Sequence, residues 1–128
     1  MRKMAENKFA PMAGLPSCAT LAVQSGDPAK GASVILLKAK PGCMIPWHWH
    51  TPTESVMMVS GSAKLEMKDH PAVVLGPGGY GQLVGKHVHQ FTCMSACTAF
   101  VSAEGAVDIH YVDVKGNEIT PDVALKRK

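Results

Sequence analysis

The pattern of apolar and polar residues along this chain predicts many short β-strands. From residue 33 onward, brief runs rich in apolar and β-branched residues alternate with turn-forming Gly, Pro and Asp. The strands expected from this pattern are 20–24, 34–40, 44–50, 54–60, 63–68, 72–75, 80–84, 86–93, 97–103 and 107–114. Turn signals spaced by about 8–12 residues are typical of an all-β sandwich or barrel.

The same pattern predicts a single domain over residues 1–128. The first 32 residues are broken repeatedly by Gly and Pro, so we expect an arm with one or two short strands there. The barrel itself is expected at 33–114, and a C-terminal tail at 115–128. No long stretch shows helical periodicity, and a terminal turn over 122–128 is the one helical element expected.

Composition narrows the classes of partner. Hydrophobic residues make up 46% of the chain and charged residues 18%, which is the balance of a folded globular domain and not of a disordered chain. Its net charge of +3 includes the three terminal residues Lys126, Arg127 and Lys128, so the body is near neutral. Without a stripe of Lys and Arg or a long apolar run, we expect neither a nucleic-acid partner nor a membrane partner.

The four cysteines leave two interpretations open. Cys18, Cys43, Cys93 and Cys97 form no CxxC pair, which argues against a zinc ribbon. Buried free thiols are the favoured interpretation, and a disulfide of unassigned pairing is the alternative. Residues 1–8 carry several charged side chains and no apolar leader follows them, so a cytoplasmic location is expected, or a periplasmic one if a signal peptide has been removed.

Histidines spaced by two residues suggest a metal site. On a strand, residues i and i+2 point to the same face, so His48 and His50 lie together, as do His87 and His89. Glu54 follows a short turn and can return to the same region from the next strand. Imidazole and carboxylate ligands suit Fe, Mn, Ni, Cu, Co or Zn, so a divalent transition metal is the expected cofactor.

The spacing of these residues resembles the cupin superfamily. Gly42-x5-His48-x-His50-x3-Glu54-x6-Gly61 matches all five fixed positions of the first cupin motif. Residues 78–89 fill the place of the second motif, and His89 stands where that motif has its metal-binding histidine. This second segment departs from the family pattern: the acidic residue after its first Gly is absent, Val84 replaces Pro, and Lys86 replaces Gly. The chain is also similar to small single-domain cupins of unassigned function.

The resemblance implies a fold, a ligand set and an assembly. The fold would be a double-stranded β-helix, or jelly-roll barrel, with the metal held by His48, His50, Glu54 and His89. Cupins also imply a homodimer whose N-terminal strands pair across the interface. Trp47 and Trp49 alternate away from the metal-facing side, so one of them is expected near that interface.

Several roles remain open at this stage. Glu54 is either a ligand or a hydrogen-bonding partner of a ligand. His87 either lies beside the metal, as a catalytic acid or base, or swings into solvent at Gly85. His110 is expected at the surface or facing a dimer partner. The expected pocket wall, from side chains that share the inward faces, consists of Val56, Met58 and Phe91.

The predicted function is a metal-dependent enzyme acting on a small-molecule substrate. Three imidazoles and one glutamate differ from the two-histidine, one-carboxylate triad of 2-oxoglutarate-dependent enzymes. The two arginines are Arg2 and Arg127, so no arginine in the barrel could clamp a polyanion. We therefore expect a small, neutral or weakly acidic substrate and a dioxygenase-like oxidoreductase. Alternatives are a metal-dependent isomerase or lyase, and a non-catalytic module that binds metal or a small ligand.

Overall fold

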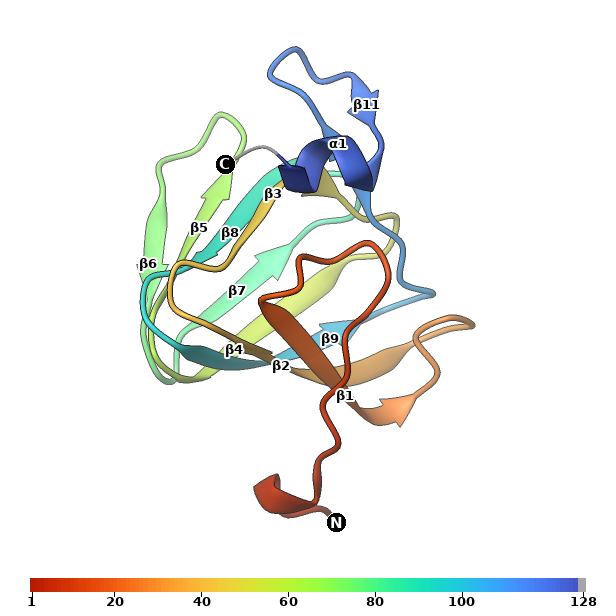
Figure 1. Cartoon of the computed structure of the whole chain (residues 1–128), viewed down its shortest axis with the longest axis vertical. Coiled ribbons are helices and arrows are strands. Elements are labelled where there is room, and N and C mark those ends of the chain that lie inside the picture. Colours follow the sequence, from red (N-terminus) through yellow and green to blue (C-terminus); the bar gives the residue numbers. More distant parts are fainter. Residues whose placement is uncertain (127–128) are drawn as a thin grey trace.

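Two antiparallel sheets face each other in the computed structural model, which describes residues 1–126 (Figure 1). The first sheet has the strand order β1 (Ala19–Gly26), β2 (Ser33–Ala39), β9 (Cys97–Ala103), β4 (Glu54–Ser60) and β7 (Tyr80–Leu83). The second has the order β11 (Glu118–Ile119), β10 (His110–Val112), β3 (Met44–Trp49), β8 (His89–Cys93), β5 (Ala63–Met67) and β6 (Val73–Leu75). Most neighbours within a sheet are distant in sequence. This arrangement confirms the all-β prediction.

Strand alternation explains which side chains enter the core. Along β4, Glu54, Val56 and Met58 are buried, whereas the end of the strand is exposed. The core between the sheets is aliphatic and rich in small residues such as Ala63 and Ala99, neither of which is exposed at all. Small side chains at these positions let the two sheets approach closely.

Two expected strands are shorter in the structure by several residues, whereas the bounds of the others differ from the expected ones by at most two. The strand expected at 86–93 begins only at His89, because Lys86 adopts a positive φ of 66° and the His87 N–H bonds the Val84 carbonyl in a turn. The strand expected at 107–114 is reduced to β10, since Val107 bonds the Pro28 carbonyl and not a neighbouring strand.

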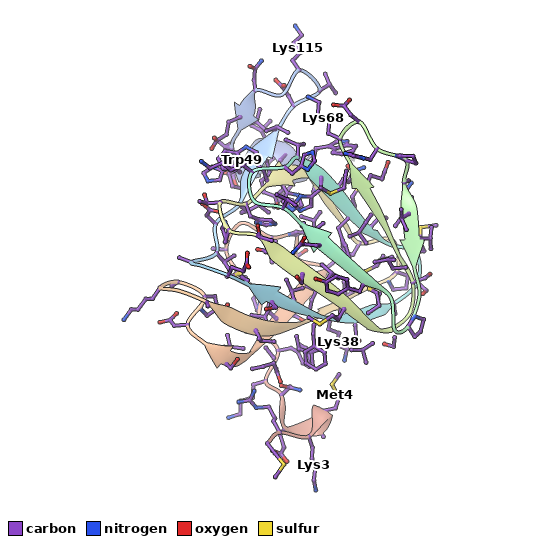
Figure 2. The ribbon with its side chains drawn as sticks, turned by 180° about the vertical axis from the view of Figure 1, so that it is seen from behind. Lys3, Met4, Lys38, Trp49, Lys68 and Lys115 are labelled. Atoms are coloured by element: carbon purple, nitrogen blue, oxygen red, sulfur yellow. A yellow bond between two sulfur atoms is a disulfide. The ribbon has the colours of Figure 1, made fainter. Side chains whose placement is uncertain are left out.

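The N-terminus adds a helix that the pattern did not predict, and the expected C-terminal turn is an α-helix. A 3-10 helix, η1, spans Met4–Glu6, and an α-helix, α1, spans Pro121–Lys126 where a terminal turn over 122–128 was expected. Residues 127–128 of that expected turn lie outside the described residues. Figure 2 shows Lys3 and Met4 at one end of the molecule, and Trp49, Lys68 and Lys115 toward the other. Within residues 1–126 no helix has the length and apolar character needed to cross a membrane.

The arm that precedes β1 folds back onto the barrel. Ala10 and Leu21 form an antiparallel bridge through two backbone hydrogen bonds of 3.0 and 2.9 Å. The hydroxyl of Tyr111, a fully buried side chain of β10, donates a 2.6 Å hydrogen bond to the Gly14 carbonyl. These contacts hold residues 10–14 of the arm beside β1 and against Tyr111 of the second sheet.

The four cysteines form two disulfides, so the expectation of free thiols was wrong. Cys18 in the arm pairs with Cys43 just before β3, and Cys93 pairs with Cys97 across the turn between β8 and β9. Their Cα atoms are 5.7 and 5.9 Å apart, within the range that a disulfide bridges. Sequence spacing gave no sign of the first pair, because the fold alone brings the arm to β3.

Candidate metal centre

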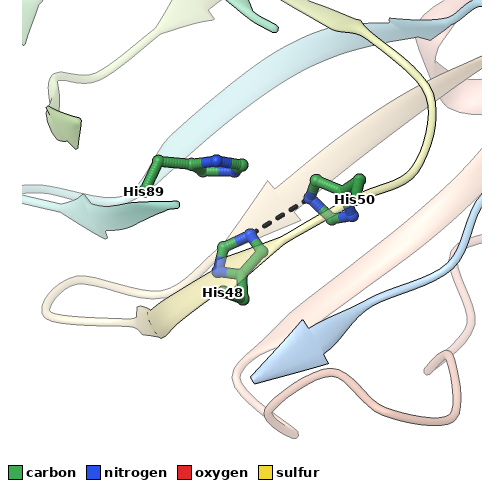
Figure 3. Close-up of side chains that lie close together, drawn as sticks. All are labelled: His48, His50 and His89. Atoms are coloured by element: carbon green, nitrogen blue, oxygen red, sulfur yellow. Dashed lines mark hydrogen bonds between the residues drawn. The ribbon is translucent and has the colours of Figure 1, made fainter. Parts of the chain in front are cut away.

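Three imidazoles meet between β3 and β8. His48 lies in β3 directly opposite His89, the first residue of β8, and His50 follows the end of β3. One ring nitrogen from each histidine can be chosen so that all three lie within 4.8 Å of one another (Figure 3). His48 and His89 are each only 2% exposed. The structure therefore brings together the three histidines that the cupin motifs indicated.

Backbone carbonyls fix the orientation of all three rings. The Nδ1 atoms of His48, His50 and His89 lie 2.5, 2.5 and 2.9 Å from the carbonyl oxygens of Pro46, Asp108 and His87. A carbonyl only accepts hydrogen bonds, so each Nδ1 carries the proton and each Nε2 presents a lone pair.

The free Nε2 atoms fit a metal ion. His48 Nε2 lies 3.1 Å from His50 Nε2, and within the described chain the buried Nε2 of His89 has no hydrogen-bond partner. Two lone pairs at this separation repel unless a cation or proton lies between them. Metal-bound histidines commonly donate their other ring N–H to a carbonyl, as all three do here. The donor set therefore suits a divalent transition metal, and its chemistry does not select one.

Burial keeps two of the imidazoles neutral. Loss of solvation lowers the pKa of His48 well below its usual value, and the neighbouring His89 and His50 lower it further. Burial likewise lowers the pKa of His89 to about 4, against a backbone hydrogen bond that raises it. Neutral imidazole is the form that binds a metal, so both side chains are ready to bind one at neutral pH.

Glu54 stands beside the imidazole cluster. Its Oε1 lies 3.6 Å from His50 Nε2, and the residue is 6% exposed. Burial raises the pKa of this carboxyl group, which the nearby His50 lowers and Asp108 raises. Glu54 does not belong to the group whose ligand atoms lie within 4.8 Å of one another. Both roles foreseen for it, ligand or partner of a ligand, remain predictions.

His87 lies on the outside of the barrel. Its side chain is exposed, and its ring lies 5.7 Å from that of His70 over a shallow surface groove. Of the two orientations that the sequence left open, the structure has the one in solvent. A catalytic role for His87 stays a prediction from sequence, and no contact with the imidazole cluster supports it.

An aliphatic cavity of about 190 Å³ adjoins the three-histidine cluster. It lies over β2 and β9 and under the arm, and its walls include Met12, Leu15, Ile35, Leu37, Ile45 and Val101. The ionisable residues in its lining are His48, His50, Glu54 and Asp108, without a Lys or Arg. The expected wall residues Val56, Met58 and Phe91 are instead packed in the core.

Asp108 is a site residue that the motifs did not indicate. Its carboxylate accepts hydrogen bonds from the backbone N–H of Thr51, at 2.7 Å, and from the Thr51 hydroxyl. With its carbonyl bonded to His50, Asp108 holds the segment that follows β3. The Asp108 carboxylate also forms a hydrogen bond with the ring of His110. That ring is stacked on Trp49 with centroids 4.0 Å apart. Aspartate in a loop carries no sequence signal for such a role.

The chain is similar in fold to several solved structures. A cupin described as RmlC-like from Ralstonia eutropha JMP134 is 24% identical, with a TM-score of 0.72 over 98% of this chain and 81% of that one. DMSP lyase DddQ from Ruegeria pomeroyi DSS-3 is 17% identical, with a TM-score of 0.67 over 91% of this chain and 61% of that one. Oxalate decarboxylase from Bacillus subtilis is 14% identical, with a TM-score of 0.64 over 80% and 28%.

These likenesses show the fold over most of the chain. They confirm the predicted cupin resemblance and the double-stranded β-helix. No family model matches the sequence, and none of the curated proteins does either.

Proposed function

We propose that this chain is a metal-dependent enzyme acting on a small, neutral or weakly acidic organic molecule. The observation that carries the proposal is the convergence of three Nε2 lone pairs beside an aliphatic cavity. Three protein ligands leave at least one coordination position for a water or a substrate. A structural site would instead be closed by protein ligands on all sides.

The cavity defines the substrate by size and charge. A cavity of about 150 Å³ accommodates benzene, so 190 Å³ suits an organic molecule slightly larger than that. Its aliphatic walls favour an apolar body, and the lack of Lys or Arg in the lining disfavours a phosphate or a polycarboxylate. The polar part of the substrate would lie at the end formed by the imidazoles and Glu54.

The site residues would divide the chemistry between them. A bound divalent metal would supply Lewis-acid polarisation of a substrate oxygen. The imidazoles hold their orientation through the three backbone carbonyls. Glu54 lies where the cavity meets the imidazoles, so its carboxylate is placed to accept a proton from the substrate or return one to it.

A lyase or decarboxylase reaction is the class we favour. Two structurally similar proteins are named a DMSP lyase and an oxalate decarboxylase, and proton transfer by a carboxylate suits elimination chemistry. An oxygenase remains the second candidate, because open positions on a histidine-bound metal can also take dioxygen. A non-catalytic binding module is the third.

Metal analysis combined with turnover assays would test the proposal. Purified protein should retain about one transition-metal ion per chain, and His48→Ala with His50→Ala should abolish this. A panel of short hydroxy acids, keto acids, β-diketones and catechols would be followed by mass spectrometry, with oxygen consumption recorded in parallel. Turnover without oxygen uptake supports the lyase, turnover with uptake supports the oxygenase, and binding without turnover supports the binding module.

Assembly and compartment are separate proposals. We propose a homodimer on the cupin resemblance, with the half-buried Trp47 or Trp49 near the interface. Light scattering that shows a monomer at micromolar concentration would contradict it.

Two disulfides favour an oxidising compartment, and therefore the periplasmic alternative over the cytoplasmic one. Thiol alkylation of protein isolated from its native cells would test this, since free thiols would contradict it.

A further inference from the structure

A buried serine without a hydrogen-bond partner lies in the wall of the cavity. Ser33, the first residue of β2, is 5% exposed and is one of the residues that line the cavity. Among residues 1–126 nothing accepts from or donates to its hydroxyl. Leaving a buried hydroxyl without a hydrogen-bond partner destabilises the folded protein. An alanine at this position would avoid that destabilisation, so the hydroxyl needs an explanation.

The strand register places Ser33 in one row with Glu54. Ser33 pairs with Ala103 across β2 and β9, and Ala103 pairs with Glu54 across β9 and β4. Residues directly opposite in antiparallel strands point to the same face, and all three residues line the cavity. Neighbouring strands are about 4.8 Å apart, so the backbones at Ser33 and Glu54 are separated by about 10 Å.

The rest of this face is apolar. Ala103 in the middle of the row presents only a methyl group, which leaves room above it. The next inward-facing row along the same strands contains Ile35 and Val101, and both line the cavity. The cavity therefore has a polar end, formed by the imidazoles and Glu54, an aliphatic middle, and one isolated hydroxyl on the far side.

We propose that Ser33 is a specificity-determining residue that hydrogen-bonds a second oxygen function of the bound molecule. The substrate class is then a short aliphatic molecule with oxygen functions at two ends: one end meets the metal centre, and the other meets Ser33. That second function is neutral, a hydroxyl or a carbonyl, because no cation in the lining could balance a carboxylate there. This inference rests on the proposed function and names the substrate class of the same site.

Two matched probes separate the ends of the cavity. Pentanohydroxamate and 5-hydroxypentanohydroxamate share a metal-binding head and differ in whether the tail ends in a hydroxyl. Both would be titrated calorimetrically into Co(II)-loaded protein, and the visible spectrum of Co(II) would report whether the head reaches the metal. The proteins compared are the wild type, Ser33→Ala, Ser33→Thr, which keeps a hydroxyl, and the control Ser102→Ala. Ser102 lies next to Ala103 in β9 and outside the cavity lining.

The expected result is a loss confined to one probe and one hydroxyl. Ser33→Ala should weaken binding of the hydroxyl-tailed probe by about five- to tenfold and change the methyl-tailed probe by less than about twofold. Ser33→Thr should recover part of the loss, and Ser102→Ala should match the wild type. Thermal unfolding of each variant would show that the fold is retained.

The outcomes distinguish this inference from the proposed function. If both probes alter the Co(II) spectrum but Ser33→Ala binds them as the wild type does, the role of Ser33 is wrong and the metal site stands. Equal affinity of the wild type for the two probes also overturns the role of Ser33. If neither probe binds to Co(II)-loaded wild type, both proposals fail at this site.

Discussion

Two segments of this chain carry the same His-x-His spacing and fold differently. In the first, His48 and His50 both turn toward the cluster, with ring centroids 4.7 Å apart. In the second, His89 joins the cluster while His87 lies on the outer surface against His70. Spacing by two therefore placed neighbours on one face in only one of the two segments, because alternation requires an extended backbone through both residues.

The difference originates in the turn before β8. Lys86 adopts a left-handed conformation, with a φ of 66°, which few residues other than Gly adopt without strain. Its N–H donates a 2.7 Å hydrogen bond to the His50 carbonyl, and the Gly85 N–H bonds the Thr53 hydroxyl at 3.0 Å. A Cβ at Gly85 would lie 2.5 Å from the Thr51 carbonyl oxygen, so only glycine fits this close approach. The turn therefore bonds to the residues that follow β3, and the strand pairing of the second segment with the first begins only at His89.

The largest expected effect separates His89 from His87. His89→Ala removes one of the three converging imidazoles and should weaken metal binding by at least about a hundredfold. His87→Ala should leave metal affinity and any metal-dependent turnover within about twofold, because its side chain is exposed. Competition with a chromophoric chelator measures both affinities. Loss of metal from His87→Ala would contradict the structural difference between the two segments.

The stability of the metal-free protein should depend on pH through the buried imidazoles. The pKa of His89 falls from 6.5 in the unfolded chain to about 4 in the folded one, so the unfolded chain binds this proton more readily between those values. Stability is therefore complete above pH 6.5 and decreases as the pH falls toward 4, by about 3 kcal/mol for this group. Burial of His48 acts in the same direction.

Urea unfolding of the metal-free protein at several pH values would measure this dependence. The variant His89→Gln should show a smaller decrease in unfolding free energy between pH 6.5 and 4 than the wild type. The raised pKa of Glu54 has the opposite sign, since protonating a buried carboxyl group stabilises the folded state as the pH falls. Repeating the titration with Glu54→Gln in both proteins removes that contribution. Equal slopes with and without His89 would overturn the prediction.

Substitution of Glu54 would test whether its carboxylate contributes to metal binding at the histidine cluster. Glu54→Gln keeps the shape of the side chain and removes its charge, and we expect metal affinity to fall by about tenfold to a hundredfold. Any metal-dependent turnover should fall further than metal occupancy accounts for if the carboxylate transfers protons. Measuring turnover at saturating metal separates these effects. Unchanged affinity together with unchanged turnover would exclude both roles.

The smallest expected effect concerns the turn itself. Lys86→Gly removes the strain of the left-handed conformation, which stabilises the folded state, and increases the entropy of the unfolded chain, which destabilises it. The first effect is the larger, so the free energy of unfolding should rise by about 0.5–1 kcal/mol. Lys86→Ala retains the strain and serves as the matched control, with no comparable gain. Urea unfolding measures both. A loss of stability in Lys86→Gly would show that the lysine side chain, and not its backbone, matters at this turn.

Much of the architecture followed from local pattern. The bounds expected for two strands, 54–60 and 97–103, match β4 and β9, because alternation and turn residues act over a few neighbouring positions. The orientation of His48 and His50 toward one another followed from the same alternation, and motif spacing indicated that His89 joins them. These features depend on the chain close to each residue, so the sequence alone determines them.

Tertiary structure decided what depends on contacts between distant segments. The pairing of Cys18 with Cys43, the position of Asp108 behind His50 and the cavity under the arm each join parts of the chain that no local pattern connects. The outward position of His87 belongs to this group as well, because the turn at Lys86 is held by the carbonyl of His50, thirty-six positions earlier in the sequence. Backbone carbonyls carry no side-chain identity, so the hydrogen bonds that orient the imidazoles could be seen only once the fold had brought their acceptors into place.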